Sequence, residues 1–276
     1  GKGSVIGNEM AGSPKIDIVS VTGSVGAGES IMAAASKNIT KVSLELGGKA
    51  PAIVCKDADL EKAAQWIVDS RIGNNGQICN NAERVYVQKE VKAEFTKILV
   101  KKMEAVKVGD VCQDHTVDMG PLVEARALES VTEKVERAIK QGAKLLCGGH
   151  RVGTKGYFYA ATVLDGCTQD MDIIHEETFG PVIPLVEFDT LDQVIAWAND
   201  CEYGLASSVF TKDIDTATRV ARELEFGETY INREHFEAMQ GFHAGVKKSG
   251  IGGADGKHGI EEYLVTHVTY LDTHYE

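Results

Sequence analysis

The sequence lacks any long uninterrupted apolar segment. None of its 276 residues lies in a stretch approaching the roughly 18 to 20 consecutive apolar residues of a membrane span, and the first residues lack the apolar core of a signal peptide. Basic runs are also missing, because the 29 lysines and arginines are scattered and the formal net charge is -12. These absences disfavour a membrane or a nucleic acid as partner and lead us to expect a cytoplasmic protein.

Clustered cysteines are lacking as well. The six cysteines lie far apart, at positions 55, 79, 112, 147, 167 and 201, without a C-x-x-C pair or histidines at ligand spacing. Neither a disulfide framework nor a metal site is therefore predicted, and reduced thiols in a cytosol fit better. Internal repeats, low-complexity tracts and long linkers are also missing, so the chain has the pattern of an ordinary globular protein.

Apolar segments with strand character alternate with segments of helical periodicity. We expect strands over 15–22, 41–46, 50–55, 84–88, 183–188, 206–210 and 228–231, and helices over 60–72, 91–106, 122–141, 191–199 and 214–224. This alternation predicts an α/β fold with a mostly parallel sheet covered by helices. A last alternating segment, 264–271, has no helix after it, and we expect an edge strand there that could pair with another subunit.

Residues 23–28, GSVGAG, separate an expected strand from an expected helix. Backbone N–H groups and a positive helix terminus at such a turn could bind a phosphate. The spacing is G-x-x-G-x-G, which departs from the usual dinucleotide fingerprint, so a simple tight turn explains it equally well. Two other motifs fail: a phosphate-binding loop would need Gly at Ser43 and a hydroxyl at Ala50, and a metalloprotease helix beginning at His175 would need a second His at Phe179.

A carboxylate and a thiol have unusual neighbours. Glu45 ends an apolar segment, where desolvation would raise its pKa toward that of a general base. A glutamate at a strand end whose carboxylate reaches solvent is an equally good interpretation of this residue. Cys79 lies in GNNGQICNN, residues 73–81, a polar turn with amide donors of the kind that a thiolate nucleophile needs. For a lone cysteine, simple packing is nevertheless the commoner role.

Taken together, these segments resemble the NAD(P)-dependent aldehyde dehydrogenase superfamily over nearly the whole chain. The resemblance rests on five motifs in the family's order and spacing: TGS (22–24) with Gly28, ELGGKAP (45–51), GQIC (76–79), EETFGP (176–181) and KSGIG (248–252). Segments 228–234 and 239–245 are most similar to members that act on lactaldehyde or glycolaldehyde. Oxidation of small hydroxy-aldehydes to carboxylic acids is therefore the activity that the resemblance implies.

The resemblance also implies catalytic roles. Cys79 would attack the aldehyde carbon to give a thiohemiacetal, which becomes a thioester after hydride transfer, and its backbone N–H would form half of the oxyanion hole. Glu45 would activate the water that hydrolyses the thioester and could help to deprotonate the thiol. The cofactor would be NAD, with NADP not excluded, because the discriminating acidic residue would lie upstream.

Cofactor and substrate contacts follow from the same match. Gly23 and Ser24 would contact the phosphate side of the cofactor, and Glu177 and Phe179 would hold the nicotinamide ribose and ring. Residues 248–252 would form a loop near the substrate entrance. Three polar side chains there would suit a hydroxy-aldehyde, namely Asn80, Glu237 and His243. A pair between Glu237 and His243 that only stabilises the loop is the alternative.

By the match, residues 1–47 would be the C-terminal part of the NAD-binding domain, 48–247 the catalytic domain, and 248–276 a tail with the oligomerisation strand. We expect a homo-oligomer, dimer or tetramer, and a fragment of a longer protein, because the chain starts inside a glycine-patterned loop. Two alternatives remain. One is a catalytically silent, self-associating fragment; the other is a CoA-acylating semialdehyde dehydrogenase, which would not need Glu45 to activate water.

Overall fold

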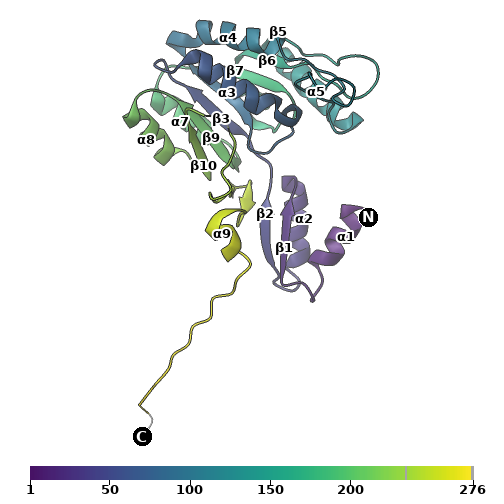
Figure 1. Ribbon diagram of the computed structural model, residues 1–276, viewed down its shortest axis with the longest axis vertical. Coiled ribbons are helices and arrows are strands. Elements are labelled where there is room, and N and C mark those ends of the chain that lie inside the picture. Colours follow the sequence, from purple (N-terminus) through teal and green to yellow (C-terminus); the bar gives the residue numbers. More distant parts are fainter. Residues whose placement is uncertain (234, 275–276) are drawn as a thin grey trace.

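The computed structural model describes residues 1–233 and 235–274, which form a large α/β body and a smaller one beside it (Figure 1). The large body contains a seven-stranded sheet in the order β10-β9-β3-β4-β7-β6-β5. All neighbouring strands in it are parallel except β5 and β6. The strands are β3 (Ala50–Val54), β4 (Ala82–Gln88), β5 (Lys144–Cys147), β6 (Thr162–Cys167), β7 (Val182–Phe188), β9 (Ala206–Phe210) and β10 (Glu228–Ile231).

Helices cover both faces of this sheet. Ala52 and Val54 pack with α3 (Leu60–Ile72) and α4 (Lys92–Glu104), whereas Ile53 packs in the cluster of the opposite face. Successive strand residues face opposite sides, so a strand covered on both sides is apolar throughout. The second face carries α5 (Ala125–Lys140), α6 (Asp172–His175), α7 (Leu191–Asn199) and α8 (Ile214–Glu223). The predicted α/β class is thus confirmed, and no helix within the described ranges is long and apolar enough to cross a membrane.

The smaller body joins the two ends of the chain. Its sheet has the order β1-β2-β12, with β1 (Ile18–Thr22) parallel and β12 (Gly250–Ile251) antiparallel to β2 (Lys41–Glu45). The accompanying helices are α1 (Gly3–Ala11), α2 (Val25–Ala35) and α9 (Gly256–Glu261). The expected entrance loop at 248–252 therefore contains a strand. In this strand Gly250 pairs with Glu45. A Cβ at position 250 would lie 2.3 Å from the Leu44 carbonyl oxygen, so the close approach of the two strands requires glycine there.

Short two-residue strands connect the bodies. β8 (Tyr203–Gly204) pairs with β11 (Val246–Lys247). The Ser249 hydroxyl accepts a hydrogen bond from the Gly204 N–H at 2.9 Å and donates one to the Gly47 carbonyl at 2.7 Å. This buried serine fixes the segment after β2 against the large body. Such two-residue strands carry too little periodicity to be predicted from sequence.

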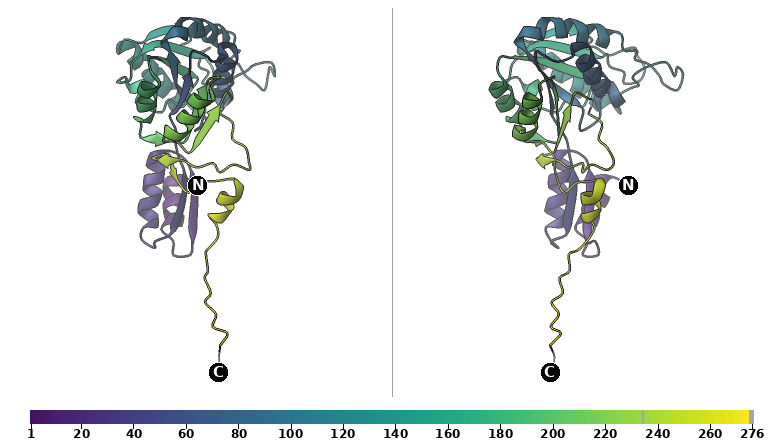
Figure 2. Two further views of the ribbon diagram at one scale, coloured as in Figure 1. Left: turned by 90° about the vertical axis from the view of Figure 1, so that its left-hand side faces the viewer. Right: turned by 60° about the vertical axis from the view of Figure 1, so that its left-hand side comes forward.

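The expected strand at 264–271 does not form within the described chain. The segment runs away from both bodies (Figure 2), and Val265 and Tyr270 are each 94% exposed. A strand needs a neighbour for its backbone hydrogen bonds, and nothing in 1–233 or 235–274 supplies one here. The segment is therefore not a strand within the described chain, and the edge strand that pairs with another subunit stays a prediction.

Candidate active site

The segment before Cys79 reverses direction in a turn, η1 (Gly73–Gly76), with left-handed backbone. Asn74, Asn75 and Gly76 have φ values of 45°, 61° and 72°. Asparagine tolerates this region better than most residues, and glycine adopts it without strain. A Cβ at Gly76 would also lie 2.3 Å from the Gly180 carbonyl oxygen. The polar, glycine-containing sequence is therefore what allows the thiol to be presented at this point.

Two glycines bring three motifs together. A Cβ on Gly48 would lie 2.1 Å from the Cys79 carbonyl oxygen, and a Cβ on Gly47 would lie 2.8 Å from both carboxylate oxygens of Glu177. The Gly48 N–H donates to Glu177 Oε1 at 2.9 Å. Because residues 47 and 48 lack side chains, the segment that carries Cys79 and the Glu177 carboxylate can both approach the chain just after Glu45.

Glu45, the last residue of β2, is buried at 8% exposure. The Gly23 N–H donates to its backbone oxygen at 2.9 Å, whereas its carboxylate oxygens have no hydrogen-bond partner in the described part of the chain. Burial raises the pKa of Glu45 to about 7, although the neighbouring His243 acts in the opposite direction. The alternative that Glu45 reaches solvent is therefore wrong, and the carboxylate has the pKa of a base that works near neutral pH.

His243 lies between acidic groups and the thiol. Its Nδ1 is 3.0 Å from Glu228 Oε1, and its Nε2 is 3.6 Å from Glu45 Oε2. The interaction with the Cys79 side chain, followed by that with Glu228, raises the pKa of His243 to about 11. The imidazole is thus a cation at neutral pH. Sequence reasoning missed Glu228, although it begins a segment, 228–234, that already stood out by its resemblance.

Asn80 and Glu237 interact directly. The Asn80 amide donates to Glu237 Oε2 at 2.7 Å, and Asn80 is buried. The alternative that Glu237 pairs with His243 is wrong, because the ion-pair partners of His243 among the described residues are Glu45 and Glu228. The structure therefore places all three expected substrate residues around Cys79, in two separate contacts.

The chain as a whole matches a known family. The family model described as "Aldehyde dehydrogenase family" matches residues 1–269. The chain belongs to the aldehyde dehydrogenase family. It is 58% identical over 273 residues to lactaldehyde dehydrogenase of Escherichia coli (strain K12), covering 99% of this chain and 57% of that protein. A crystal structure of lactaldehyde dehydrogenase from Escherichia coli superimposes with a TM-score of 0.97 at 59% identity, covering 98% of this chain and 57% of the other.

Other aldehyde dehydrogenases are similar at lower identity. The chain is 44% identical to 3,6-anhydro-alpha-L-galactose dehydrogenase of Vibrio sp. (strain EJY3) over 99% of its own length and 57% of the relative's. It is 39% identical to D-glyceraldehyde dehydrogenase (NADP(+)) of Picrophilus torridus, with 99% and 56% coverage. The chain thus spans a little over half the length of these relatives.

The residues expected to hold the cofactor lie in two places. Ser24 caps α2, because its hydroxyl accepts the Ala27 N–H at 3.3 Å. Phe179 has a left-handed backbone with φ 50° and is 41% exposed, so its ring is available to a ligand. Burial, followed by the charge of Glu83, raises the pKa of Glu177 to about 7. An exposed aromatic face, a nearby carboxylate and a capped helix start suit a dinucleotide, and in this respect the residues fit.

A buried ionic network supports the Phe179 segment, and sequence reasoning missed it. Glu83 Oε2 is 2.6 Å from Lys49 Nζ, and Glu83 Oε1 is 3.0 Å from an Arg71 nitrogen, with all three side chains 0–2% exposed. Glu83 also accepts the backbone N–H groups of Thr178 and Phe179 at 2.9 and 3.1 Å. Burial acts to raise the pKa of Glu83, but Arg71 and Lys49 outweigh it and bring the pKa to about 2. The available signal was an acidic residue directly before the strand expected at 84–88.

Three other cysteines, Cys55, Cys147 and Cys167, are buried or half-buried. Burial raises the pKa of Cys55 and Cys167 to about 12 and that of Cys147 to about 11, as expected for inert thiols. Cys79 is half-buried and belongs to the polar turn. Within the described ranges, no group of three or more His, Cys, Asp or Glu side chains could hold a metal ion.

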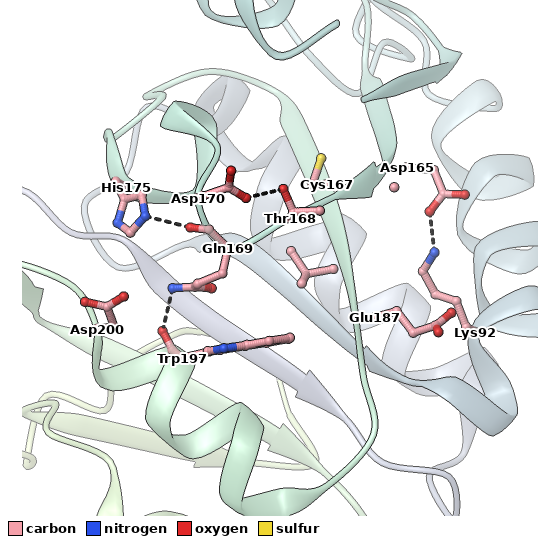
Figure 3. Close-up of a pocket in the computed structure, with 12 residues that line it drawn as sticks. Lys92, Asp165, Cys167, Thr168, Gln169, Asp170, His175, Glu187, Trp197 and Asp200 are labelled. Carbon is pink, nitrogen blue, oxygen red and sulfur yellow. Dashed lines mark hydrogen bonds and ion pairs between the residues drawn. The ribbon is translucent and has the colours of Figure 1, made fainter. Parts of the chain in front are cut away.

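One large open cavity lies away from Cys79. It has a volume of about 860 Å³ and opens at the carboxyl ends of β6 and β7 (Figure 3). Cys79 instead precedes the amino end of β4. Its polar groups are largely paired with one another, since Gln169 donates to the Trp197 carbonyl at 3.0 Å and Thr168 donates to Asp170 at 2.5 Å. Size alone therefore does not identify the reacting centre.

Proposed function

We propose that this chain carries the thiol chemistry of an NAD-dependent aldehyde dehydrogenase that oxidises small hydroxy-aldehydes, such as lactaldehyde or glycolaldehyde, to carboxylic acids. The observation that carries the proposal is the meeting of Cys79, Glu45 and His243, from three distant segments, at one largely buried site. Because the chain spans 57% of the similar lactaldehyde dehydrogenase, the complete activity is part of this proposal.

Cys79 supplies the nucleophile. The thiol first loses its proton to water or to Glu45, Sγ then forms a bond to the aldehyde carbon, and the carbonyl electrons move to the oxygen, which the Cys79 backbone N–H stabilises. NAD, when bound, would accept the hydride from this carbon, and as the hydride leaves, the C=O double bond re-forms to give a thioester on Cys79. Glu45 then takes a proton from water, the hydroxide attacks the thioester carbon, and the C–S bond breaks to release the acid and the thiol.

Polar groups beside Cys79 favour a substrate with hydroxyls. Asn80, Glu237 and His243 present an amide, a carboxylate and an imidazolium, all of which can bond a hydroxyl next to the aldehyde. A site built to bond a hydroxyl rejects an apolar analogue strongly, because its buried polar groups would be left unpaired. We therefore expect hydroxy-aldehydes to be preferred over alkyl aldehydes of the same length.

Cofactor and assembly complete the proposal. NAD would be held by Gly23, Ser24, Glu177 and Phe179. NADP is the alternative cofactor, because one similar protein is named D-glyceraldehyde dehydrogenase (NADP(+)). The domain limits 1–47, 48–247 and 248–276, and a homo-oligomer formed through the exposed 264–271 segment, also belong to the proposal. CoA acylation is disfavoured, because a buried carboxylate with a pKa of about 7 suits water activation.

The decisive variant is Cys79→Ser. We expect iodoacetamide to label Cys79 fastest of the six cysteines. These 276 residues alone should have low activity, so C79S is tested in a complete chain, where it should abolish aldehyde-dependent NADH formation while calorimetric titration still detects NAD. Cys112→Ser is the matched control, because Cys112 is exposed and distant in sequence from every candidate residue. Turnover that persists in C79S would exclude the proposed mechanism, and a chain that binds no NAD would favour the silent-fragment alternative.

A further inference from the structure

Glu228 and His243 meet although they come from different segments. Glu228 is the first residue of β10 in the large body. His243 exchanges two backbone hydrogen bonds, of 2.9 and 2.8 Å, with Ala254, which lies just before α9 of the smaller body. A Cβ at Gly227 would lie 1.6 Å from the Ala244 carbonyl oxygen, so glycine at that position allows the two segments to touch.

Glu228 fixes the orientation of the His243 ring. Its Oε1 is 3.0 Å from His243 Nδ1, and its Oε2 accepts the Tyr230 hydroxyl at 2.6 Å. A carboxylate can only accept hydrogen bonds, so Nδ1 carries a proton and donates a hydrogen bond to Glu228. The side chains of Glu228 and His243 are only 14% and 11% exposed, so water screens this pair weakly. The ring is therefore held with Nδ1 toward β10.

The opposite nitrogen, Nε2, faces Glu45. It is 3.6 Å from Glu45 Oε2, which is longer than a hydrogen bond, and the Glu45 carboxylate has no hydrogen-bond partner in the part of the chain that the structure describes. Cys79 and then Glu228 raise the pKa of His243 to about 11, and Glu45 acts in the same direction, so Nε2 is also protonated at neutral pH. Asp255 is a further carboxylate whose charge acts on Glu45. The Nε2–H group is thus a donor that lies beside Glu45 without being bound to it.

We propose that Glu228 is a positioning residue that determines substrate selectivity, because it holds His243 with Nε2–H turned toward Glu45 as a donor for the substrate hydroxyl. This inference rests on the proposed function, in which His243 contacts the hydroxyl of a small hydroxy-aldehyde.

Selectivity follows from the fixed donor. A hydroxyl oxygen next to the aldehyde accepts a hydrogen bond from Nε2–H, whereas an alkyl aldehyde of the same length leaves this buried donor unpaired. Without the charge of Glu228 at Nδ1, the ring would be free to turn and would lose a proton more readily. The neutral ring could then present Nε2 as an acceptor. Glu228 therefore acts on the substrate through His243 and not by direct contact.

NMR of the histidine side chains tests the first step without aldehyde or cofactor. We expect both ring nitrogens of His243 to stay protonated to about pH 10 in the folded chain, with the signals identified by their loss in His243→Gln. Glu228→Gln keeps the size of the side chain but removes its charge, so deprotonation should begin about one pH unit lower or more. Glu225→Gln is the matched control, because Glu225 lies on the same segment with its side chain 60% exposed. The same titration of His243 in wild type and E228Q would overturn the inference.

Steady-state kinetics in a complete chain test the second step. We expect E228Q to lower kcat/KM for lactaldehyde about tenfold or more, chiefly through KM, because the hydrogen bond to the hydroxyl is lost. For propanal, which has no hydroxyl, kcat/KM should fall by less than about threefold. The double variant E228Q/H243Q should lose no more selectivity than H243Q alone, since Glu228 acts through His243.

Circular dichroism confirms that each variant is folded. Equal losses for the two aldehydes would overturn the inference, because a role limited to folding affects both alike, and additive losses in the double variant would overturn it as well. The NMR titration requires neither turnover nor NAD. If C79S kept its turnover, the proposed mechanism would fail, while the titration would still decide whether Glu228 controls His243.

Discussion

The buried carboxylate of Glu83 provides the sharpest test of what holds the site together. Glu83→Gln keeps the size of the side chain but removes the charge that balances Lys49 and Arg71, both of which are 0% exposed. The variant also replaces a carboxylate that accepts two backbone N–H groups from the segment carrying Phe179. Two cations would then remain buried without a counter-charge.

Two separate arguments give a similar loss of stability for Glu83→Gln. Breaking a buried ion pair by removing one partner costs about 3–5 kcal/mol. Independently, a folded pKa of about 2 for Glu83, against its ordinary value of 4.5, corresponds to roughly 3 kcal/mol at neutral pH, at about 1.4 kcal/mol per pKa unit. We therefore expect E83Q to lower the free energy of unfolding by roughly 3 kcal/mol, or the melting temperature by roughly 10 °C.

The pH dependence follows from the direction of the shift. Because the pKa of Glu83 is depressed in the folded state, its contribution is fully present above pH 4.5 and is lost as pH falls toward 2. Urea unfolding of wild type and E83Q at pH 7 and pH 3.5 measures both effects, and the difference between them should shrink at the lower pH. Glu129→Gln, on the exposed face of α5, is the control and should change stability by less than about 0.5 kcal/mol. A cost below about 1 kcal/mol at pH 7 would refute the reasoning.

Two further predictions concern the chemistry. Gly48→Ala places a Cβ 2.1 Å from the Cys79 carbonyl oxygen, so the nucleophile must move, and we expect kcat/KM for aldehyde oxidation to fall about 100-fold or more. Gly3→Ala, whose Cβ meets nothing within 4 Å, should be neutral in the same steady-state assay. The rate of thioester hydrolysis should rise as pH passes about 7, because Glu45 must lose its proton to act as base. Glu45→Gln should remove that step and slow hydrolysis about 100-fold or more, and an unchanged pH profile would contradict the assignment.

Local patterns were enough to predict the main elements. The apolar strands β3 and β7 and the helix α3 lie within a residue or two of their expected bounds, because period and capping are local properties. Asp59 caps α3, because its side chain accepts the Lys62 N–H at 3.2 Å. Asp57 instead accepts the Thr211 hydroxyl and the Lys212 N–H, which lie far along the chain. That difference depends on which segments become neighbours.

Some elements could not be predicted for the same reason. β12 has two residues and exists because Gly250 can lie against Leu44, which no local periodicity encodes. Residues 264–271 show the reverse case, since their alternation is typical of a strand but the described chain offers no partner. A strand forms only when its backbone hydrogen-bonds to a second segment, whereas the sequence pattern describes one segment alone.

The amino-acid sequence by itself determined the α/β class, the polar turn around Cys79 and the glycines that make close approach possible. It also contained the five motifs on which the resemblance to aldehyde dehydrogenases rests. Only the tertiary structure decided that Glu45 is buried, that Glu228 holds His243 beside the thiol, and that Glu83 balances two cations beneath Phe179. The physical reason is that pKa and charge pairing depend on distance and burial, which arise when segments far apart in the chain pack together.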